Sequence, residues 1–148
     1  MKYHFNIYRK ENGACLSDGI EIPDCTGKGE TKDDLWENLK KALHIYLDDA
    51  VAAGERVPMP DNEYNGDTEV LRVPVDIKLA FPIILRNIRL GRNLTVEQAQ
   101  QLMGLQSKSS YTRLEAKCNP NLETLQRVFN AFPEFPIERV LSIKTSPE

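Results

Sequence analysis

The segment MGLQSKSSYTRLEAK, from Met103 to Lys117, carries the side chains best suited to contact chemistry. After Met103, hydroxyl, amide and cationic groups surround three large apolar anchors, which are Leu105, Tyr111 and Leu114. Tyr111 and Leu114 are three residues apart and would share one face of a helix, so the polar side chains would point away from the core. The segment therefore predicts a small helix that offers hydrogen bonds and positive charge to a partner.

The charge of the chain is divided unevenly between its halves. The 148 residues have a net charge of -3, but residues 1–74 hold 9 Lys and Arg against 15 Asp and Glu, whereas residues 75–148 hold 10 against 7. The first half therefore has a net charge of -6 and the second of +3. This asymmetry indicates different partners, a polyanion for the second half and a basic protein for the first. The alternative is a pair of solvated surfaces.

Metal and disulfide chemistry find little support in the sequence. Cys15, Cys25 and Cys118 are odd in number and form no Cys-x-x-Cys pair, so neither a disulfide framework nor a zinc site is indicated. His4 and His44, taken with Cys15 and Cys25, lack the close pairing that tetrahedral metal sites usually show. We predict no metal and no cofactor.

Membrane insertion and export are not indicated either. No apolar run approaches the roughly 20 residues that a membrane span requires. The N-terminal MKYHFNIYRK has no apolar signal core. We therefore expect a cytoplasmic protein without membrane contact.

The elements that must position these side chains fall into two groups, which favours two small cores over one. The first group begins with an alternating strand, KYHFNIYR (Lys2–Arg9), and a turn at Asn12-Gly13, followed by two short extended stretches. Thr31 is the expected N-cap of a long amphipathic helix, and Gly54 is the expected residue at its end.

A change of composition follows this helix. Residues 57–67, VPMPDNEYNGD, are rich in proline and contain Asn-Gly, which predicts a loop or linker. Residues 68–75 are again extended in character, so the chain returns to the sheet before leaving it. We place the domain boundary near Pro74, which gives domains of residues 1–74 and 75–148.

Residues 75–148 carry helical signals in quick succession. Leu79 to Leu90 is apolar at helical spacing, and Pro82 must either start this helix or kink it. Thr95 and Gln98 form a capping-box pattern before a short helix. Its apolar stripe consists of Val96, Ala99, Leu102 and Met103. Further helices are expected after the cap Ser107, from Asn121 with Leu122, Leu125, Val128 and Phe129, and over residues 137–143.

One stretch of the second half carries a family resemblance. LTVEQAQQLMGLQSKSSYTRLE, from Leu94 to Glu115, resembles the helix-turn-helix of Cro/repressor-type (XRE) DNA-binding domains, and NLETLQRVFNAF resembles the helix that follows it. The chain departs from the family pattern in two places: it has one extra residue between Gly104 and Ser107, and it has Gln100 where a small alanine is usual nearby. The resemblance implies that Arg89 forms a structural ion pair with Glu115 at the end of the recognition helix.

The first half of the sequence carries a second resemblance, to a more specific family. IPDCTGKGETKDDLWENLKKALHIYLDDAVAAGERVPMP resembles the HicB antitoxin family, in which a degenerate ribonuclease-H-like unit is followed in many members by such a DNA-binding domain. The resemblance implies that the protein binds a small HicA-type toxin, which is an mRNA-cleaving endoribonuclease, covers the toxin's active site and represses its own operon. The expected fold class is α+β, with a small N-terminal β-sheet and one packed helix, followed by an all-α helix-turn-helix domain that also dimerises.

Catalysis by the chain itself is not expected. A ribonuclease-H site needs several carboxylates converging on two metal ions, yet the first strand has no acidic residue, and Asp18, Glu21 and Asp24 are scattered through turns and strand ends. Ser17 or Cys15 could be paired with His4 or His44, but no nucleophile motif supports such a pair. We predict that the protein is not an enzyme.

The segment from Ser107 to Lys117 is best interpreted as a recognition helix for the major groove of operator DNA. Lys108 and Arg113 have the reach for guanine O6 and N7, and Ser107 and Ser109 can donate near the helix N-terminus. The expected DNA-binding residues are Ser107, Lys108, Ser109, Thr112, Arg113, Lys117 and Asn121, the last two at phosphates. We expect a homodimer or a tetramer.

Two alternatives remain open. The segment could form a polar helical hairpin without a nucleic-acid partner. The chain could also be a stand-alone transcription regulator whose first domain senses a small ligand.

Overall fold

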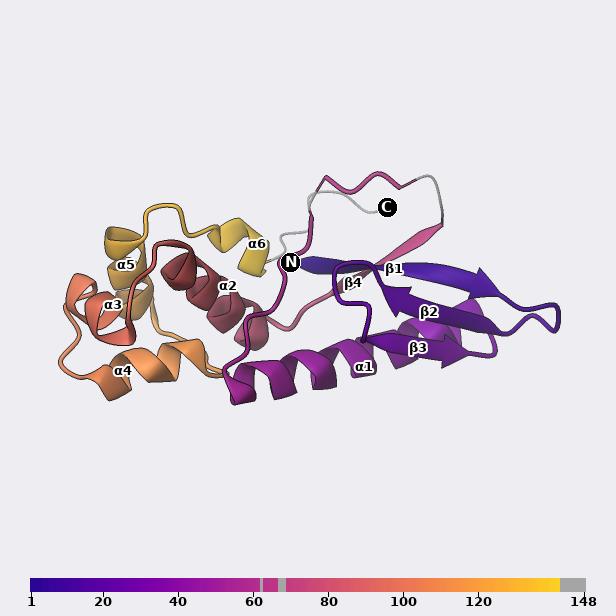
Figure 1. Ribbon diagram of the computed structural model, residues 1–148, viewed down its shortest axis with the longest axis horizontal. Helices are drawn as coiled ribbons and strands as arrows, with labels where there is room; N and C mark the ends of the chain where they lie inside the picture. The colour runs from indigo at the N-terminus through magenta and orange to yellow at the C-terminus, as the bar shows by residue number, and fades with distance from the viewer. Residues whose placement is uncertain (62, 67–68, 142–148) are drawn as a thin grey trace. The chain divides into compact units, whose positions relative to one another are not determined.

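The computed structural model describes residues 1–61, 63–66 and 69–141, and the chain divides into two compact units. The first unit comprises Met1–Asp49 and Pro58–Val75, and the second comprises Ala50–Val57 and Asp76–Glu148. The architecture is α+β, with a small antiparallel sheet in the first unit and helices in the second (Figure 1). The second unit includes residues 50–57, which the sequence analysis assigned to the N-terminal domain.

The sheet has four strands in the order β3-β2-β1-β4, and all neighbours are antiparallel. The strands are β1 (Lys2–Arg9), β2 (Cys15–Gly19), β3 (Thr26–Gly29) and β4 (Val70–Pro74). Phe5 lies opposite Gly19 on one side and Leu71 on the other. The strand predicted at Lys2–Arg9 is confirmed, and so is the turn, where Gly13 has a φ of +88°. Thr68, part of the predicted return strand, lies outside the described residues.

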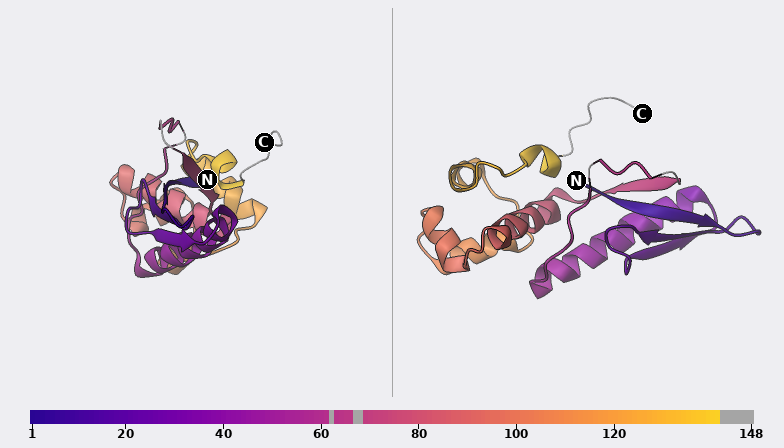
Figure 2. Two further views of the ribbon diagram at one scale, coloured as in Figure 1. Left: turned by 90° about the vertical axis from the view of Figure 1, so that its right-hand side faces the viewer. Right: turned by 45° about the horizontal axis from the view of Figure 1, so that its top comes forward.

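Helix α1 (Lys32–Ala53) lies along one face of the sheet (Figures 1 and 2). Its start is the predicted one, because the Asp34 N–H donates to Thr31 Oγ1 at 3.1 Å. The glycines of β3 let the helix approach: a Cβ on Gly27 would lie 2.5 Å from Leu39. The apolar face of α1 is buried through Leu35, Leu39, Leu43 and Leu47.

The predicted loop at residues 57–67 contains neither helix nor strand in its described part, and Asn62 and Asp67 lie outside that part. No helix in the portion of the chain that the structure describes combines the length and the apolar character of a membrane span.

The second unit is built from short helices around α2 (Ile77–Gly91), which contacts both η1 and α6. The others are α3 (Val96–Leu102), α4 (Lys108–Thr112), the 3-10 turn η1 (Arg113–Glu115), α5 (Leu122–Ala131) and α6 (Ile137–Leu141). Residues 142 and 143 of the predicted last helix lie outside the described residues. The core gathers Leu79, Phe81, Ile84, Val128, Phe132 and Phe135.

Two leucines that were predicted to lie on buried apolar stripes are exposed. Leu102 in α3 is 52% exposed and Leu122 at the start of α5 is 84% exposed. Both lie at helix ends, where a helical repeat no longer guarantees that a core lies opposite.

Pro82 neither starts α2 nor interrupts it. The helix begins at Ile77, where the Asp76 side chain accepts a hydrogen bond from the Lys78 N–H, and it runs through Pro82 to Gly91. Pro82 has no N–H to donate to the carbonyl of Lys78, four residues earlier. That carbonyl instead accepts a hydrogen bond from the Cys118 N–H at 3.3 Å. The backbone group that proline leaves unpaired is thus used to fix the chain that follows η1.

Candidate nucleic-acid interface

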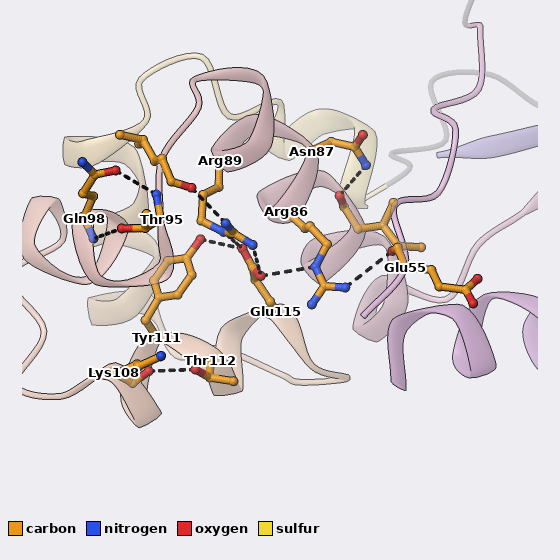
Figure 3. A network of polar contacts seen from close by, with 12 residues as sticks. Glu55, Arg86, Asn87, Arg89, Thr95, Gln98, Lys108, Tyr111, Thr112 and Glu115 are labelled. Carbon is orange, nitrogen blue, oxygen red and sulfur yellow. Dashed lines mark hydrogen bonds and ion pairs between the residues drawn. The ribbon is translucent and has the colours of Figure 1, made fainter. Parts of the chain in front are cut away.

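Helices α3 and α4 are joined by a tight turn, and a side chain caps the N-terminus of each helix. Gln98 N–H donates to Thr95 Oγ1 at 3.1 Å, and Thr95 N–H donates to Gln98 Oε1 at 2.8 Å, which confirms the predicted capping box (Figure 3). Gly104 follows α3 with a φ of +64°, a left-handed conformation that glycine adopts most easily. Ser107 then caps α4 by accepting a hydrogen bond from the Ser110 N–H.

The turn between the helices is further held by two long side chains. Gln100 is one of the positions at which the chain departs from the helix-turn-helix pattern. Its Nε2 donates to the carbonyl of Leu105 at 2.8 Å. Arg127 Nη1 donates to the carbonyls of Met103 and Gly104 at 3.3 and 3.1 Å. The orientation of α4 relative to α3 is therefore fixed by hydrogen bonds as well as by apolar packing.

Helix α4 has one buried face and one exposed face. Tyr111 is fully buried, and Leu114 and Glu115 in η1 are buried with it. The opposite side chains are exposed and, together with Ala116, line a shallow hollow: Lys108, Ser109, Thr112 and Arg113. The structure thus brings together four of the seven residues that the sequence analysis assigned to DNA contact.

The remaining three residues lie elsewhere. Ser107 is the exposed N-cap of α4, and Lys117 is exposed but lies beyond η1. Asn121 caps α5, with its Oδ1 accepting a hydrogen bond from the Thr124 N–H at 2.8 Å.

The segment from Ser107 to Lys117, which was predicted to be a recognition helix, contains less α-helix than predicted. Helix α4 ends at Thr112 and continues as the 3-10 turn η1. Serine and threonine are weak helix formers because their hydroxyls compete for backbone groups, and Thr112 Oγ1 donates to the Lys108 carbonyl at 2.9 Å.

A buried carboxylate anchors the end of this segment (Figure 3). Glu115 is 4% exposed, and Arg89 binds it bidentately, with Nε 2.5 Å from Oε1 and Nη2 3.0 Å from Oε2. Tyr111 donates its hydroxyl to Oε1 at 2.9 Å. Arg89 also donates to the Leu94 carbonyl at 2.9 Å, at the entry to α3. The pair that the resemblance implied therefore connects α2, α3 and η1.

The electrostatics of this cluster favour the ionised carboxylate. Burial acts to raise the pKa of Glu115, but hydrogen bonds from Arg89 and Tyr111 and the charges of Arg89 and Arg86 outweigh it, so its pKa is lowered. The hydrogen bond to Glu115 raises the pKa of Arg89. Burial, and then the charge of Glu115, raise the pKa of Tyr111 far above its usual value. Tyr111 is therefore a neutral donor that holds α4 to η1.

Sequence reasoning missed a second arginine at this carboxylate. Arg86 Nε donates to Glu115 Oε2 at 3.2 Å. A signal was present, because Arg86 and Arg89 are three residues apart in a predicted helix and so share one face. The family resemblance implies one arginine partner for Glu115, whereas the structure gives it two.

Sequence reasoning also missed an ion pair across the two helices. Lys108 Nζ lies 2.8 Å from Glu97 Oε1, and both side chains are more than half exposed. The hydrogen bond from Lys108 lowers the pKa of Glu97. One of the two cations proposed to contact bases is therefore paired with a carboxylate in the isolated chain.

The first unit contains a polar pair between His4, in strand β1, and Glu21. His4 is 3% exposed, and its Nδ1 lies 2.5 Å from Glu21 Oε1, which also accepts a hydrogen bond from the Asp61 N–H at 3.2 Å. His4 is thus a hydrogen-bonded core residue. Within the described ranges no group of three or more His, Cys, Asp or Glu side chains could hold a metal ion. Burial raises the pKa of the Cys25 thiol to about 11.

Comparison with known proteins gives likenesses to solved structures only. No family model and no curated protein matches the sequence. The fold is similar to the N-terminal domain of the Burkholderia pseudomallei antitoxin HicB, with 19% identity and a TM-score of 0.43 over 51% of this chain and 99% of that chain. It is also similar to the B. pseudomallei antitoxin HicB structure, with 17% identity and a TM-score of 0.44 over 64% of this chain and 87% of that chain. At these values the likenesses assign no family, and the function proposed below is argued from the chain's own residues.

Proposed function

We propose that this chain is a repressor of the antitoxin type, whose second unit contacts operator DNA and whose first unit binds a small basic toxin protein. The observation that carries the proposal is the two-faced helix α4. Tyr111 and Glu115 anchor one side of the α4–η1 segment in the core, while Lys108 and Arg113 extend from the other side into solvent.

The exposed side offers the chemistry of direct base readout. Lysine and arginine can donate to guanine O6 and N7 in the major groove, and serine and threonine hydroxyls can bind either bases or phosphates. Ser109 and Thr112 lie beside the two cations on the same hollow. A palindromic operator would require two such helices, so we propose a homodimer or a tetramer as the binding species.

The toxin-binding part of the proposal rests on the first half of the sequence. Residues 1–74 carry a net charge of -6, which complements the basic surface expected of a protein that binds RNA. The HicB-like pattern from Ile22 to Pro60 points to the same kind of partner. Inhibition of this kind needs no catalysis by the antitoxin, because covering the toxin's active site is sufficient.

The DNA part is tested with the double variant Lys108→Ala and Arg113→Ala. The probe is a duplex from the region immediately upstream of the gene, compared with a scrambled duplex at the same salt concentration. We expect specific affinity to fall by about 1–3 kcal/mol for each good base contact that is lost.

The matched control removes two exposed cations of the first unit, Lys10→Ala and Lys41→Ala, and should retain the preference for the upstream duplex. Equal losses in both double variants, or no loss in either, would contradict a base-contacting role for α4.

The toxin part is tested with the full chain and the product of the adjoining reading frame. A short basic protein encoded there should co-purify with the chain, and co-expression of the chain should relieve its toxicity. If no such product is retained or neutralised, the ligand-sensing regulator becomes the better explanation of the first unit.

A further inference from the structure

We propose that Arg86 is a positioning residue for α4, and that it couples the segment Gly54–Val57 to the carboxylate at the end of η1. The inference rests on the proposed DNA-binding function and adds a residue and a segment that control it. Three sets of contacts support it, two at Arg86 and one at the neighbouring Asn87.

The first set links Arg86 to both partners at once (Figure 3). Its Nε donates to Glu115 Oε2 at 3.2 Å, and its Nη1 approaches the Glu55 carbonyl at 3.5 Å. The Arg86 side chain is 17% exposed, and its contact with Glu115 is partly buried, whereas its contact with the Glu55 carbonyl is exposed. Arginine can serve two acceptors because its donors form a rigid planar fork.

The second set explains why a cation is needed at Glu55. Helix α1 ends at Ala53, and its last turn contains no basic residue to offset the partial negative charge of its final carbonyls. The Arg86 guanidinium, on α2, lies at the Glu55 carbonyl, two residues beyond that helix end, and adds positive charge there. Gly54 makes the approach feasible, because it takes a φ of +73° and a Cβ there would lie only 3.3 Å from Arg86 Nη1.

The third set fixes the same segment one residue further along α2. Asn87 Nδ2 donates to the Val57 carbonyl at 3.2 Å, and Asn87 Oδ1 accepts a hydrogen bond from Arg56 Nε at 3.2 Å. Arg86 and Asn87 together therefore hold residues 55–57 along α2.

The consequence for α4 follows from the count of donors on Glu115. Oε1 accepts hydrogen bonds from Arg89 and Tyr111, whereas Oε2 accepts them from Arg89 and Arg86. Without Arg86 the carboxylate would be held from α2 by Arg89 alone, and η1 and α4 would be positioned less firmly. Displacement of residues 54–57 would remove the other contact of the Arg86 guanidinium, so this segment helps to set the position of α4.

The test compares Arg86→Ala with Arg92→Ala in the full chain. Arg92 is a matched control, because it also contacts one carboxylate, Glu134, and one backbone carbonyl, Ala131, but neither belongs to the α4 anchor. The readout is the ratio of affinities for the upstream and scrambled duplexes, measured where all variants are folded. We expect Arg86→Ala to lower this ratio about tenfold, the size of one lost charge-assisted hydrogen bond, and Arg92→Ala to leave it nearly unchanged.

Arg86→Lys separates position from charge. Compared with Arg86→Ala, Arg86→Lys should bind the scrambled duplex more tightly, because the positive charge is restored. It should not recover the wild-type ratio of affinities, because an ammonium group cannot span both partners as a guanidinium group does. Equal discrimination in Arg86→Ala and Arg92→Ala would overturn the proposal. If Arg86→Ala does not fold, the test rests on Arg86→Lys. A wild-type ratio of affinities in Arg86→Lys would then overturn the proposal.

Amide hydrogen exchange over residues 108–115 distinguishes this inference from the function on which it rests. If the wild-type chain shows no preference for any upstream duplex, the proposed function fails. The positioning role is then decided by exchange alone: faster exchange in Arg86→Ala than in Arg92→Ala supports it, and equal exchange refutes it.

Discussion

Removal of the negative charge on Glu115 is the perturbation for which the structure predicts the largest loss of stability. Glu115→Gln keeps the shape of the side chain but leaves Arg86 and Arg89, 17% and 11% exposed, without their counter-charge. Breaking a buried ion pair by removing one partner destabilises a protein by about 3–5 kcal/mol. Because the glutamine oxygen can still accept a hydrogen bond, we expect about 3 kcal/mol.

The assay is equilibrium unfolding in urea followed by circular dichroism. Glu134→Gln is the matched control, since Glu134 forms a surface pair with Arg92 and is 45% exposed, for which about 0–1 kcal/mol is expected. If the two variants lose the same free energy of unfolding, Glu115 is not the anchor of the α4–η1 segment.

The same carboxylate predicts a pH dependence. Because folding lowers the pKa of Glu115 below the ordinary glutamate value of 4.5, the folded state releases this proton more readily than the unfolded state. Its contribution to stability is therefore complete above pH 4.5 and is lost as the pH falls through the lowered folded value. The difference in stability between wild type and Glu115→Gln should shrink with acidification in that window, and a constant difference would refute the reasoning.

Three further predictions concern caps, the turn and a thiol. Thr95→Ala should lower the free energy of unfolding by about 1 kcal/mol, since the capping box loses its hydroxyl, as urea titration can measure. Gly104→Ala should cost about 1 kcal/mol in the same titration because of its φ of +64°, whereas Gly91→Ala, which adds a methyl group in open space, should cost nothing. Burial raises the pKa of Cys118 to about 11, so alkylation at pH 8 should be roughly a hundredfold slower than for a free thiol in an unstructured peptide, and a comparable rate would place the thiol in water.

Features that depend on neighbouring residues in the chain were predictable from the sequence. The caps Thr31, Thr95 and Ser107 are confirmed, because each satisfies the N–H of a residue three positions later and needs nothing from the rest of the fold. Strand β1 is confirmed for a related reason, since a period of two is visible in eight residues.

Features that depend on how helices pack were not predictable in the same way. The Glu97–Lys108 pair requires the angle between α3 and α4, and the contact of Arg86 with Glu55 requires the path of residues 54–57 along α2. The exposure of Leu102 likewise depends on which neighbour lies opposite the end of α3. A single sequence fixes which residues share a face, but not what lies opposite that face.

If α4 binds DNA as proposed, the Glu97–Lys108 pair would make that binding an exchange of one anion for another at Lys108. In the isolated chain the Glu97 carboxylate occupies Lys108, so an incoming DNA group must displace an internal competitor that is already in place. Weakly held polyanions lose this competition, whereas a site that also engages Arg113 can win it. Added salt weakens the internal pair and the DNA contact together, so Lys108 should contribute less to the salt dependence of binding than a cation that starts unpaired. In the proposed repressor, the Glu97 carboxylate would therefore disfavour anions that engage Lys108 alone, by the modest free energy of an exposed ion pair.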